Sequence, residues 1–268
     1  MIKHLGLKAY GKINLGLDVV RKREDGYHEV RMIMQTVRVY DKIDLVRSEQ
    51  PGIRLETNLY YLPDNENNLG YRAAKLLMDE FGVTEGVEIK MKKFIPVAAG
   101  MAGGSSDAAA VLFGVNKMFS LGLTTEQLME RGVKLGADVP YCIMRGTALS
   151  EGIGEILTPL PPMPQCQILI AKPPISVSTK FVYENLTLPS LPRDAHPNID
   201  KIAKALASRD FYGVADNLGN ILETVTIPAH PVIREIKEKM MELGAVNALM
   251  SGSGPTVFGL FVNPAAAQ

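Results

Sequence analysis

Apolar and β-branched residues dominate two long stretches near the N-terminus, residues 5 to 20 and 28 to 47. This pattern predicts two strands. Asp25-Gly26 lies between them, and that dipeptide is typical of a hairpin turn. Residues 86 to 94 alternate between apolar and polar side chains, which predicts a further strand.

Helical spacing of apolar residues follows the polar loop LPDNENN and predicts a helix from about Leu69 to Phe81. The segment TTEQLMERGVKLGADVP predicts a second helix, which ends at Gly136 and is closed by Pro140. Residues 197 to 224 and 231 to 243 also have the helical pattern.

The C-terminal part begins after LTPLPPMPQCQ, residues 157 to 167, whose four prolines mark the best candidate for a domain boundary. QILIAKP then predicts a buried strand, and NALMSGSGPTVFGLFV predicts a strand, a glycine turn and a strand. We therefore expect an α+β protein with two domains, residues 1–160 and 161–268.

Composition narrows the classes of function. Of the 268 residues, 46% are hydrophobic and 22% charged, as in ordinary globular proteins. The 29 basic and 29 acidic residues cancel, so no overall field attracts a polyanion and we expect no nucleic-acid partner. The sequence does not indicate an oligomeric state.

The lack of a recognisable signal peptide and the spacing of the cysteines lead us to expect a cytoplasmic protein. The N-terminal residues lack the apolar core of a signal peptide, and no apolar run is long enough to span a bilayer, so we expect no membrane association. Cys142 and Cys166 have neither metal-binding nor redox spacing, which fits a reducing compartment.

The segment FIPVAAGMAGGSSDAAAVLFGV, residues 94 to 115, has the pattern of a phosphate-binding loop. Small residues let backbone N–H groups approach an anion, and a helix start adds partial positive charge. Ser105, Ser106 and Asp107 are residue types that cap or begin a helix. The candidate phosphate-binding residues are Pro96, Val97, Ala98, Ala99, Gly100, Met101, Ala102, Gly103, Gly104, Ser105 and Ser106.

The common nucleotide fingerprints are missing. GxxxxGK[ST] does not occur, since Gly11-Lys12 is followed by Ile13. GxGxxG fails as well, because Val257 stands where the third glycine would follow Gly252 and Gly254. The sequence therefore argues against a P-loop ATPase and a Rossmann dehydrogenase.

Three further blocks accompany the loop: AYGKINLGLDV, LGADVPYC and MSGSGPTVFGL. Together they resemble the motifs of the GHMP kinases, the superfamily of galactokinase, homoserine kinase and mevalonate kinase. The order of GKINLGLDV, RxDGYHE (Arg23 to Glu29), the loop and LGADVP is most similar to one branch of that family, which acts on a cytidine-diphosphate-linked methylerythritol. The resemblance covers nearly the whole chain and is weakest at residues 185 to 230.

The resemblance implies an enzyme that phosphorylates the tertiary 2-hydroxyl of that substrate with ATP, in the non-mevalonate isoprenoid pathway. It implies Mg²⁺ as counter-charge to the nucleotide, with the metal-contacting group left open between Ser105, Ser106 and water. The implied fold is the two-domain GHMP kinase fold. Its N-terminal α+β domain has a left-handed βαβ crossover, and its C-terminal domain is ferredoxin-like.

In this family a lysine and an aspartate form the catalytic pair, and by motif they fall on Lys12 and Asp138. Phosphoryl transfer needs positioning, charge neutralisation and a base near the hydroxyl. A nearby ammonium favours the ionised carboxylate and steadies charge on the attacking oxygen. Asn14 shares the strand face of Lys12, and we expect it to orient polar groups of the substrate.

The pyrimidine contacts implied by the resemblance are Tyr27 and His28, with a ring for stacking and an imidazole for a base edge. The second stacking ring falls in PPISVSTKFVYENL, where Tyr183 matches best and Phe181 is the weaker option.

Two departures from the family pattern affect the expectations. Alanine stands at 98, 99 and 102, where many relatives have glycine, which predicts a stiffer loop. The chain ends at VNPAAAQ, so we expect the C-terminal domain to be incomplete at its end. Two alternatives stay open: another GHMP kinase acting on homoserine, mevalonate or a sugar, and a non-catalytic nucleotide-binding regulator.

Overall fold

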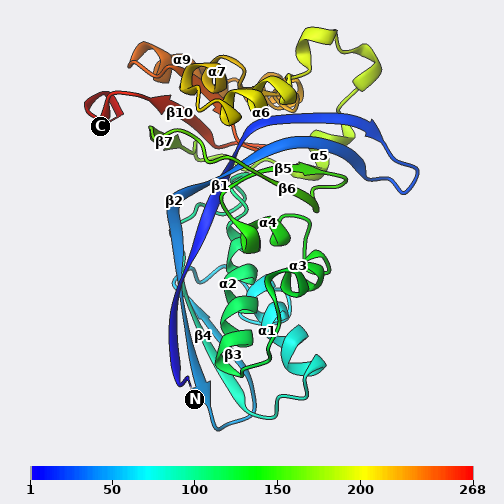
Figure 1. Ribbon diagram of the computed structural model, residues 1–268, viewed down its shortest axis with the longest axis vertical. Coiled ribbons are helices and arrows are strands. Elements are labelled where there is room, and N and C mark those ends of the chain that lie inside the picture. The colour runs from blue at the N-terminus through cyan, green and yellow to red at the C-terminus, as the bar shows by residue number, and fades with distance from the viewer. Residues whose placement is uncertain (1, 268) are drawn as a thin grey trace. The chain divides into compact units, whose positions relative to one another are not determined.

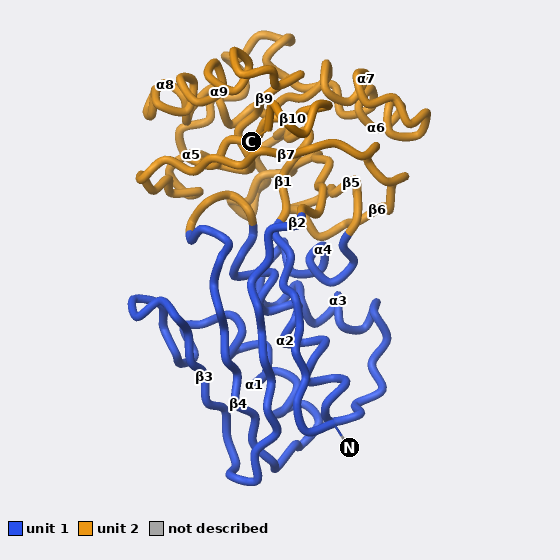
Figure 2. Tube along the Cα trace, turned by 90° about the vertical axis from the view of Figure 1, so that its left-hand side faces the viewer, with its two compact units in different colours: residues 1–11, 38–97, 102–145 blue, residues 12–37, 98–101, 146–268 orange. Residues whose placement is uncertain are grey.

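The computed structural model describes residues 2–267 and falls into two compact units, coloured separately in Figure 2. Unit 1 combines the residues up to 11 with 38–97 and 102–145, and unit 2 combines 12–37 and 98–101 with the residues from 146 onward. Strands β1 (His4–Lys22) and β2 (His28–Ser48) each contribute residues to both units. The domain boundary after residue 160 stays a prediction.

In unit 1 the strand order is β3-β4-β2-β1. β3 (Gly52–Thr57) and β4 (Gly86–Lys92) are parallel neighbours, and the chain passes through helix α1 between them, which makes a βαβ unit. The left-handedness of this crossover stays a prediction. β4 pairs antiparallel with β2, from Lys42 opposite Lys92 to Ser48 opposite Gly86.

The helices of unit 1 lie on one face of this sheet (Figure 1). They are α1 (Leu69–Glu80), α2 (Gly103–Met118), α3 (Thr125–Val133) and α4 (Val139–Met144). The Asn68 side chain caps α1 by accepting a hydrogen bond from Gly70 N–H. α2 packs against α1 and α4, and its Gly114 lies directly over Leu45 of the sheet. A small residue at that position lets α2 approach the strands closely.

In unit 2, β2 pairs antiparallel with β5 (Thr147–Glu151), which pairs with β6 (Ile156–Leu160), while the short β8 (Gly219–Asn220) runs parallel to β1. A separate three-stranded antiparallel sheet has the order β7-β10-β9. Its strands are β7 (Gln167–Ala171), β9 (Asn247–Met250) and β10 (Val257–Phe261). β10 is buried along its whole length, as a central strand should be.

The helices of unit 2 are α5 (Thr179–Glu184), α6 (Ile199–Ala207), α7 (Phe211–Asp216), α8 (Glu223–Ala229) and α9 (Val232–Glu242), with 3₁₀ turns at Leu188–Ser190, Arg193–Ala195 and Pro264–Ala267. α9 packs on β9 and β10. α6 is strongly amphipathic and buries Ile199, Ile202 and Leu206.

Several predicted elements are confirmed, and two details are wrong. The long strands, the turn at Gly26 and the β9–turn–β10 pattern are present. Residues 197 to 224 are mostly helical, as predicted, but they form separate helices, because α6 ends near Arg209, whose φ of 56° is left-handed, and β8 follows α7. Pro140 closes no helix: it lies in the first turn of α4, where its missing N–H costs nothing. β7 is half-buried rather than buried.

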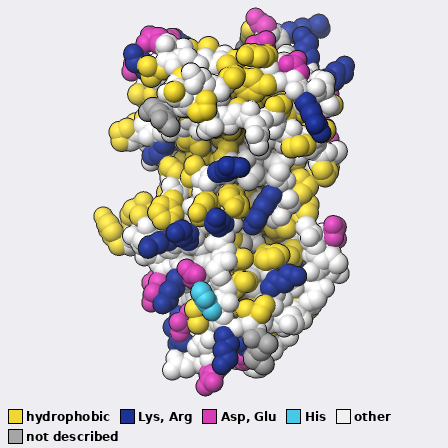
Figure 3. All heavy atoms as spheres, turned by 60° about the vertical axis from the view of Figure 1, so that its left-hand side comes forward, with side chains coloured by type: hydrophobic (Ala, Val, Ile, Leu, Met, Phe, Trp, Pro, Cys, Tyr) yellow, Lys and Arg dark blue, Asp and Glu magenta, His cyan; other side chains and the backbone are white. Residues whose placement is uncertain are grey.

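Basic, acidic and apolar side chains are mixed on the face shown in Figure 3, in keeping with a net charge of zero. Among the described residues, no helix has both the length and the apolar character needed to cross a membrane.

Candidate active site

The small-residue loop before α2 turns by means of left-handed residues. Ala98, Gly100 and Ala102 have φ values of 51°, 70° and 55°. Two of the three are alanines, for which this conformation costs about 1–2 kcal/mol each. The loop therefore holds a backbone shape that most L-residues disfavour, as binding loops commonly do.

Helix α2 begins at Gly103, and the side chain of its N-cap residue Ala102 makes no capping hydrogen bond. The first N–H groups of a helix have no partner within the helix, so they are available to an anion at this end. Gly104 is exposed, which leaves that surface open. This geometry fits a phosphate group.

Ser105, Ser106 and Asp107 lie in the first two turns of α2, as one of the two predicted roles requires, but they do not cap it, because α2 starts two residues before Ser105. Ser106 is buried instead, and its Oγ donates a hydrogen bond to the Tyr10 carbonyl 2.6 Å away. Asp107 forms a buried ion pair with Lys93. The side chains of Ser106 and Asp107 therefore interact with residues elsewhere in unit 1 and do not cap the helix.

Within unit 2, the glycine turn after β9 braces the loop segment at Gly100. Ser251 Oγ donates to the Gly100 carbonyl at 3.0 Å, and a Cβ on Gly100 would lie 2.1 Å from the Ser251 carbonyl oxygen. The backbone N–H of Lys12 also donates to the Met101 carbonyl at 3.1 Å. The first and third motif blocks therefore both contact the loop segment 98–101.

Lys12 and Asn14 lie side by side in unit 2, as their alternation along β1 predicted. Both are buried, and Lys12 Nζ donates to Asn14 Oδ1 at 2.8 Å. Asn14 Nδ2 points to the sulfur of Met32 at 3.2 Å. A buried lysine side chain held in place by an amide suits electrostatic stabilisation of a transferring phosphoryl group.

Asp138 stands at the start of α4 in unit 1, half-buried, and its side chain makes no capping hydrogen bond. α4 packs against α2, and Gly136 lies near Ser105, because an added Cβ would be 4.0 Å from Ser105 Oγ. Unit 1 therefore brings the Asp138 turn to the same end of α2 as the phosphate-binding loop. Lys12 and Asp138 belong to different units.

Among the predicted pyrimidine contacts, His28 and Tyr183 meet in unit 2 with ring centroids 5.0 Å apart and planes tilted by 43°. Burial, and then the nearby Lys22 ammonium, lower the pKa of His28. Tyr27 is 61% exposed on the hairpin, and Phe181 is 44% exposed on α5. A neutral imidazole beside a tyrosine ring is suited to a base edge.

Sequence reasoning missed a buried charged cluster in unit 1. Lys93, just after β4, donates to the carboxylates of both Asp41 on β2 and Asp107 on α2. All three are almost fully buried. No spacing in the sequence links these positions, since β-sheet pairing and helix packing bring them together.

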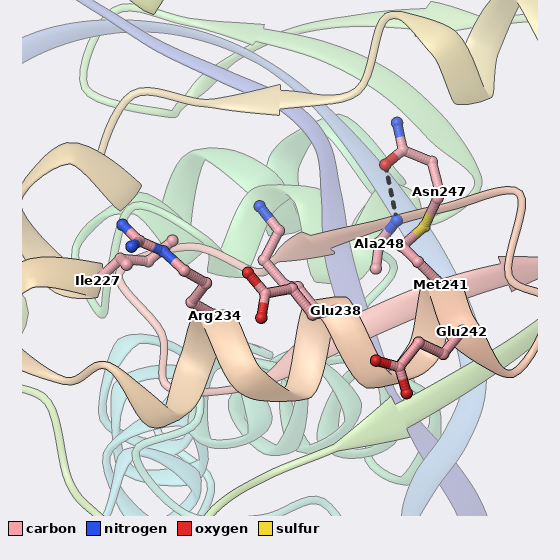
Figure 4. Close-up of a pocket in the computed structure, with 8 residues that line it drawn as sticks. Ile227, Arg234, Glu238, Met241, Glu242, Asn247 and Ala248 are labelled. Atoms are coloured by element: carbon pink, nitrogen blue, oxygen red, sulfur yellow. Dashed lines mark hydrogen bonds between the residues drawn. The ribbon is translucent and has the colours of Figure 1, made fainter.

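A separate hollow of about 550 Å³ lies on unit 2. Its lining residues, seven of them labelled in Figure 4, are Ile227, Arg234, Lys237, Glu238, Met241, Glu242, Asn247 and Ala248. None of the predicted site residues lines it. The described residues contain no group of three or more His, Cys, Asp or Glu that could hold a metal ion.

Comparison with known proteins identifies the family. The model for the GHMP kinases N terminal domain matches residues 68–146, and that for the GHMP kinases C terminal matches residues 202–268. The 4-diphosphocytidyl-2-C-methyl-D-erythritol kinase of Lachnoclostridium phytofermentans is 59% identical over 264 residues, 98% of this chain and 90% of that protein. The chain belongs to the GHMP kinase family.

Solved structures agree with that assignment. A crystal structure of 4-(cytidine 5'-diphospho)-2C-methyl-D-erythritol kinase is 32% identical and covers 98% of this chain and 92% of its own, with a TM-score of 0.84. Homoserine kinase from Cytophaga hutchinsonii has a TM-score of 0.76 at 19% identity, over 100% of this chain and 88% of that one, which shows the fold alone.

Membership of the GHMP kinase family confirms two predictions. The chain has the two-domain α+β fold of that family, and it is a small-molecule kinase with ATP as co-substrate. The loop at 96–106 lies inside the matched N-terminal region, as does Asp138.

Proposed function

We propose that the protein transfers the γ-phosphoryl group of ATP to the 2-hydroxyl of 4-diphosphocytidyl-2-C-methyl-D-erythritol, in the non-mevalonate isoprenoid pathway. The observation that carries the proposal is the 59% identity, over 98% of the chain, to a kinase named for that substrate. The small-residue loop, Lys12 and Asp138 occur in motif blocks that resemble those of the GHMP kinases, which supports the proposal.

The α2 N-terminus and the loop at 96–106 bind the phosphates of ATP through backbone N–H groups. Asp138 accepts the proton of the 2-hydroxyl, and its half-buried position beside α2 supports that role. Lys12 stabilises negative charge on the attacking oxygen and the transferring phosphoryl group, and Asn14 holds the Lys12 ammonium in place. Proton removal by a carboxylate comes late, since a carboxylate is far less basic than an alkoxide.

Mg²⁺ is part of the proposal. It usually keeps several waters and binds through one or two carboxylates together with substrate phosphates, so it does not require a cluster of protein ligands. Ser106 Oγ donates to Tyr10, which leaves the Ser105 hydroxyl, near the Asp138 turn, as the better candidate to hold the ion. When bound, the ion neutralises charge on the nucleotide phosphates.

His28 and Tyr183 hold the cytosine, with Tyr27 as a second ring from the hairpin. The contact between the rings of His28 and Tyr183 in unit 2 supports this assignment. Placement in the cytoplasm also belongs to the proposal, and the structure joins Cys142 and Cys166 to no disulfide, which fits a reducing compartment.

An ADP-release assay on a panel of acceptors tests the proposal. The cytidine-diphosphate substrate is compared with homoserine, mevalonate and galactose at equal concentrations. We expect kcat/KM for the cytidine substrate to exceed the others by at least about 1,000-fold. Comparable rates with another acceptor would assign the protein to a different GHMP kinase activity, and ATP binding without turnover of any acceptor would indicate a regulator.

A further inference from the structure

The buried cluster of Lys93, Asp41 and Asp107 contacts both ends of the phosphate-binding loop. Asp41 is fully buried, and its two oxygens accept hydrogen bonds from different donors. Oδ2 accepts from Lys93 Nζ, and Oδ1 accepts from the backbone N–H groups of Phe94 at 2.5 Å and Ile95 at 2.8 Å. Asp41 therefore holds the chain where it leaves β4 and enters the phosphate-binding loop.

The same ammonium holds the other end of the loop. Lys93 Nζ donates to Asp107 Oδ2, in the second turn of α2. A Cβ placed on Gly103, the first residue of that helix, would lie 3.5 Å from Lys93 Nζ and 3.1 Å from Ile95 Cγ2. The cluster thus lies directly against the helix start that faces the phosphates.

Two carboxyl groups share one ammonium in the cluster. Asp107 Oδ1 is buried without a hydrogen-bond partner among the described residues. Burial raises the pKa of Asp107 to about 7, Lys93 opposes that rise, and the Asp41 carboxylate adds to it. Lys93 and Asp41 are the charged groups that act on Asp107.

We propose that Asp107 is a positioning residue for ATP, which acts through Lys93 and Asp41 to hold both ends of the phosphate-binding loop and sets the charge beneath the start of α2. The inference rests on the proposed use of this loop for ATP. An uncharged Asp107 leaves the cluster neutral, whereas an ionised Asp107 gives it a net negative charge close to bound phosphates and weakens ATP binding.

The test uses the full chain and measures the Kd for ATP together with the KM of both substrates, between pH 6 and 8. Asp107→Asn keeps the shape and an acceptor for Lys93 but cannot ionise. Asp107→Ala removes the contact altogether. Asn116→Ala is the matched structural control, because Asn116 is buried on the same helix and bonds to Leu123 in the loop that follows α2.

We expect Asp107→Ala to weaken ATP at least tenfold at every pH while the KM of the acceptor stays within twofold. Between pH 6 and 8, the ATP affinity of wild type should fall about threefold to tenfold more than that of Asp107→Asn. ATP itself titrates in this range, but its titration affects both proteins equally and cancels in the comparison. Asn116→Ala should lower the melting temperature without changing ATP affinity.

Equal weakening of both substrates by Asp107→Ala, or an ATP profile of Asp107→Asn parallel to wild type, would overturn the inference. If Asp107→Ala does not fold, the pH profile of Asp107→Asn decides. Because ATP binding is measured without an acceptor, the result stands even if the acceptor proves to be a different molecule, so the two proposals fail separately.

Discussion

Ser251 Oγ donates a hydrogen bond to the Gly100 carbonyl oxygen 3.0 Å away. This contact joins the glycine turn near the C-terminus to the phosphate-binding loop within unit 2. It leaves no room for a side chain on Gly100, whose φ is 70° and whose added Cβ would overlap the Ser251 backbone. Loop shape in this kinase is therefore set by a segment far away in sequence.

Gly100→Ala should lower the free energy of unfolding by about 2–4 kcal/mol, because left-handed strain and overpacking add. Gly104→Ala is the matched control, since its added Cβ meets only Leu69 Cδ1, at an ordinary 3.5 Å. Urea denaturation of both variants measures the difference. Equal stability of the two would mean that the contact between Ser251 and Gly100 is loose in solution.

Asp138→Asn removes the proton acceptor and keeps the shape. We expect kcat to fall by about 10²–10⁴, while the Kd for ATP stays within twofold because the loop is untouched. Asp79→Asn, an exposed site paired with Lys75 on α1, controls for the loss of a charge in the same unit. Turnover within threefold of wild type would exclude Asp138 as the base.

Mutations at the proposed cytosine site should change the KM of the cytidine substrate and not that of ATP. Stacking on one aromatic face is worth about 1–3 kcal/mol, so Tyr183→Ala and Tyr27→Ala should each raise the KM of the cytidine substrate by roughly tenfold to a hundredfold. The KM of ATP should not change. Tyr→Phe should be mild at both positions, because stacking uses the ring.

Phe181→Ala separates the two candidates on α5. Tyr183 contacts His28, whereas Phe181 is 44% exposed, so we expect Phe181→Ala to have little effect. If Phe181→Ala raises the KM of the cytidine substrate strongly and Tyr183→Ala does not, the stacking ring is Phe181 and not Tyr183.

Stability should depend on pH through Asp107. Its pKa is about 7 in the folded protein, mainly because of burial, against a reference value of 3.8. Stability from this group is fully present below the reference pKa and is lost as pH rises through the folded pKa, with a slope of up to roughly 1.4 kcal/mol per pH unit. Asp107→Asn removes this dependence.

Urea denaturation at pH 5, 6, 7 and 8 tests the sign of this pH dependence of the unfolding free energy. The unfolding free energy of Asp107→Asn minus that of wild type should increase from pH 5 to 7 and level off above about 7. Parallel curves for the two proteins would show that Asp107 does not titrate in this range.

Regular elements and motif residues were predictable because their signals are local. Alternation along β1 placed Lys12 and Asn14 on one face, and the structure joins them by a hydrogen bond. The role of each, and of Asp138, stays a prediction. The left-handed φ of Ala98 and Ala102 was not predictable, since alanine carries no local preference for it.

The Lys93 cluster was hidden for a different reason. Its residues come from β2, the end of β4 and α2, and only tertiary packing brings them together. In the sequence, Ser106 and Asp107 are residue types that cap helices. In the structure, Ser106 donates a hydrogen bond to the Tyr10 carbonyl and Asp107 pairs with Lys93. Tertiary contacts, which the sequence does not show, therefore decide what these two side chains do.

The position of the transferred phosphate tests the central claim most directly. The protein is incubated with ATP, Mg²⁺ and 4-diphosphocytidyl-2-C-methyl-D-erythritol, and the products are followed by ³¹P NMR. We predict ADP and one new phosphomonoester resonance without three-bond coupling to a proton, as expected for a phosphate on the tertiary 2-oxygen, with the diphosphate bridge intact. Release of inorganic phosphate alone, or a phosphoryl group on another oxygen, would contradict the account.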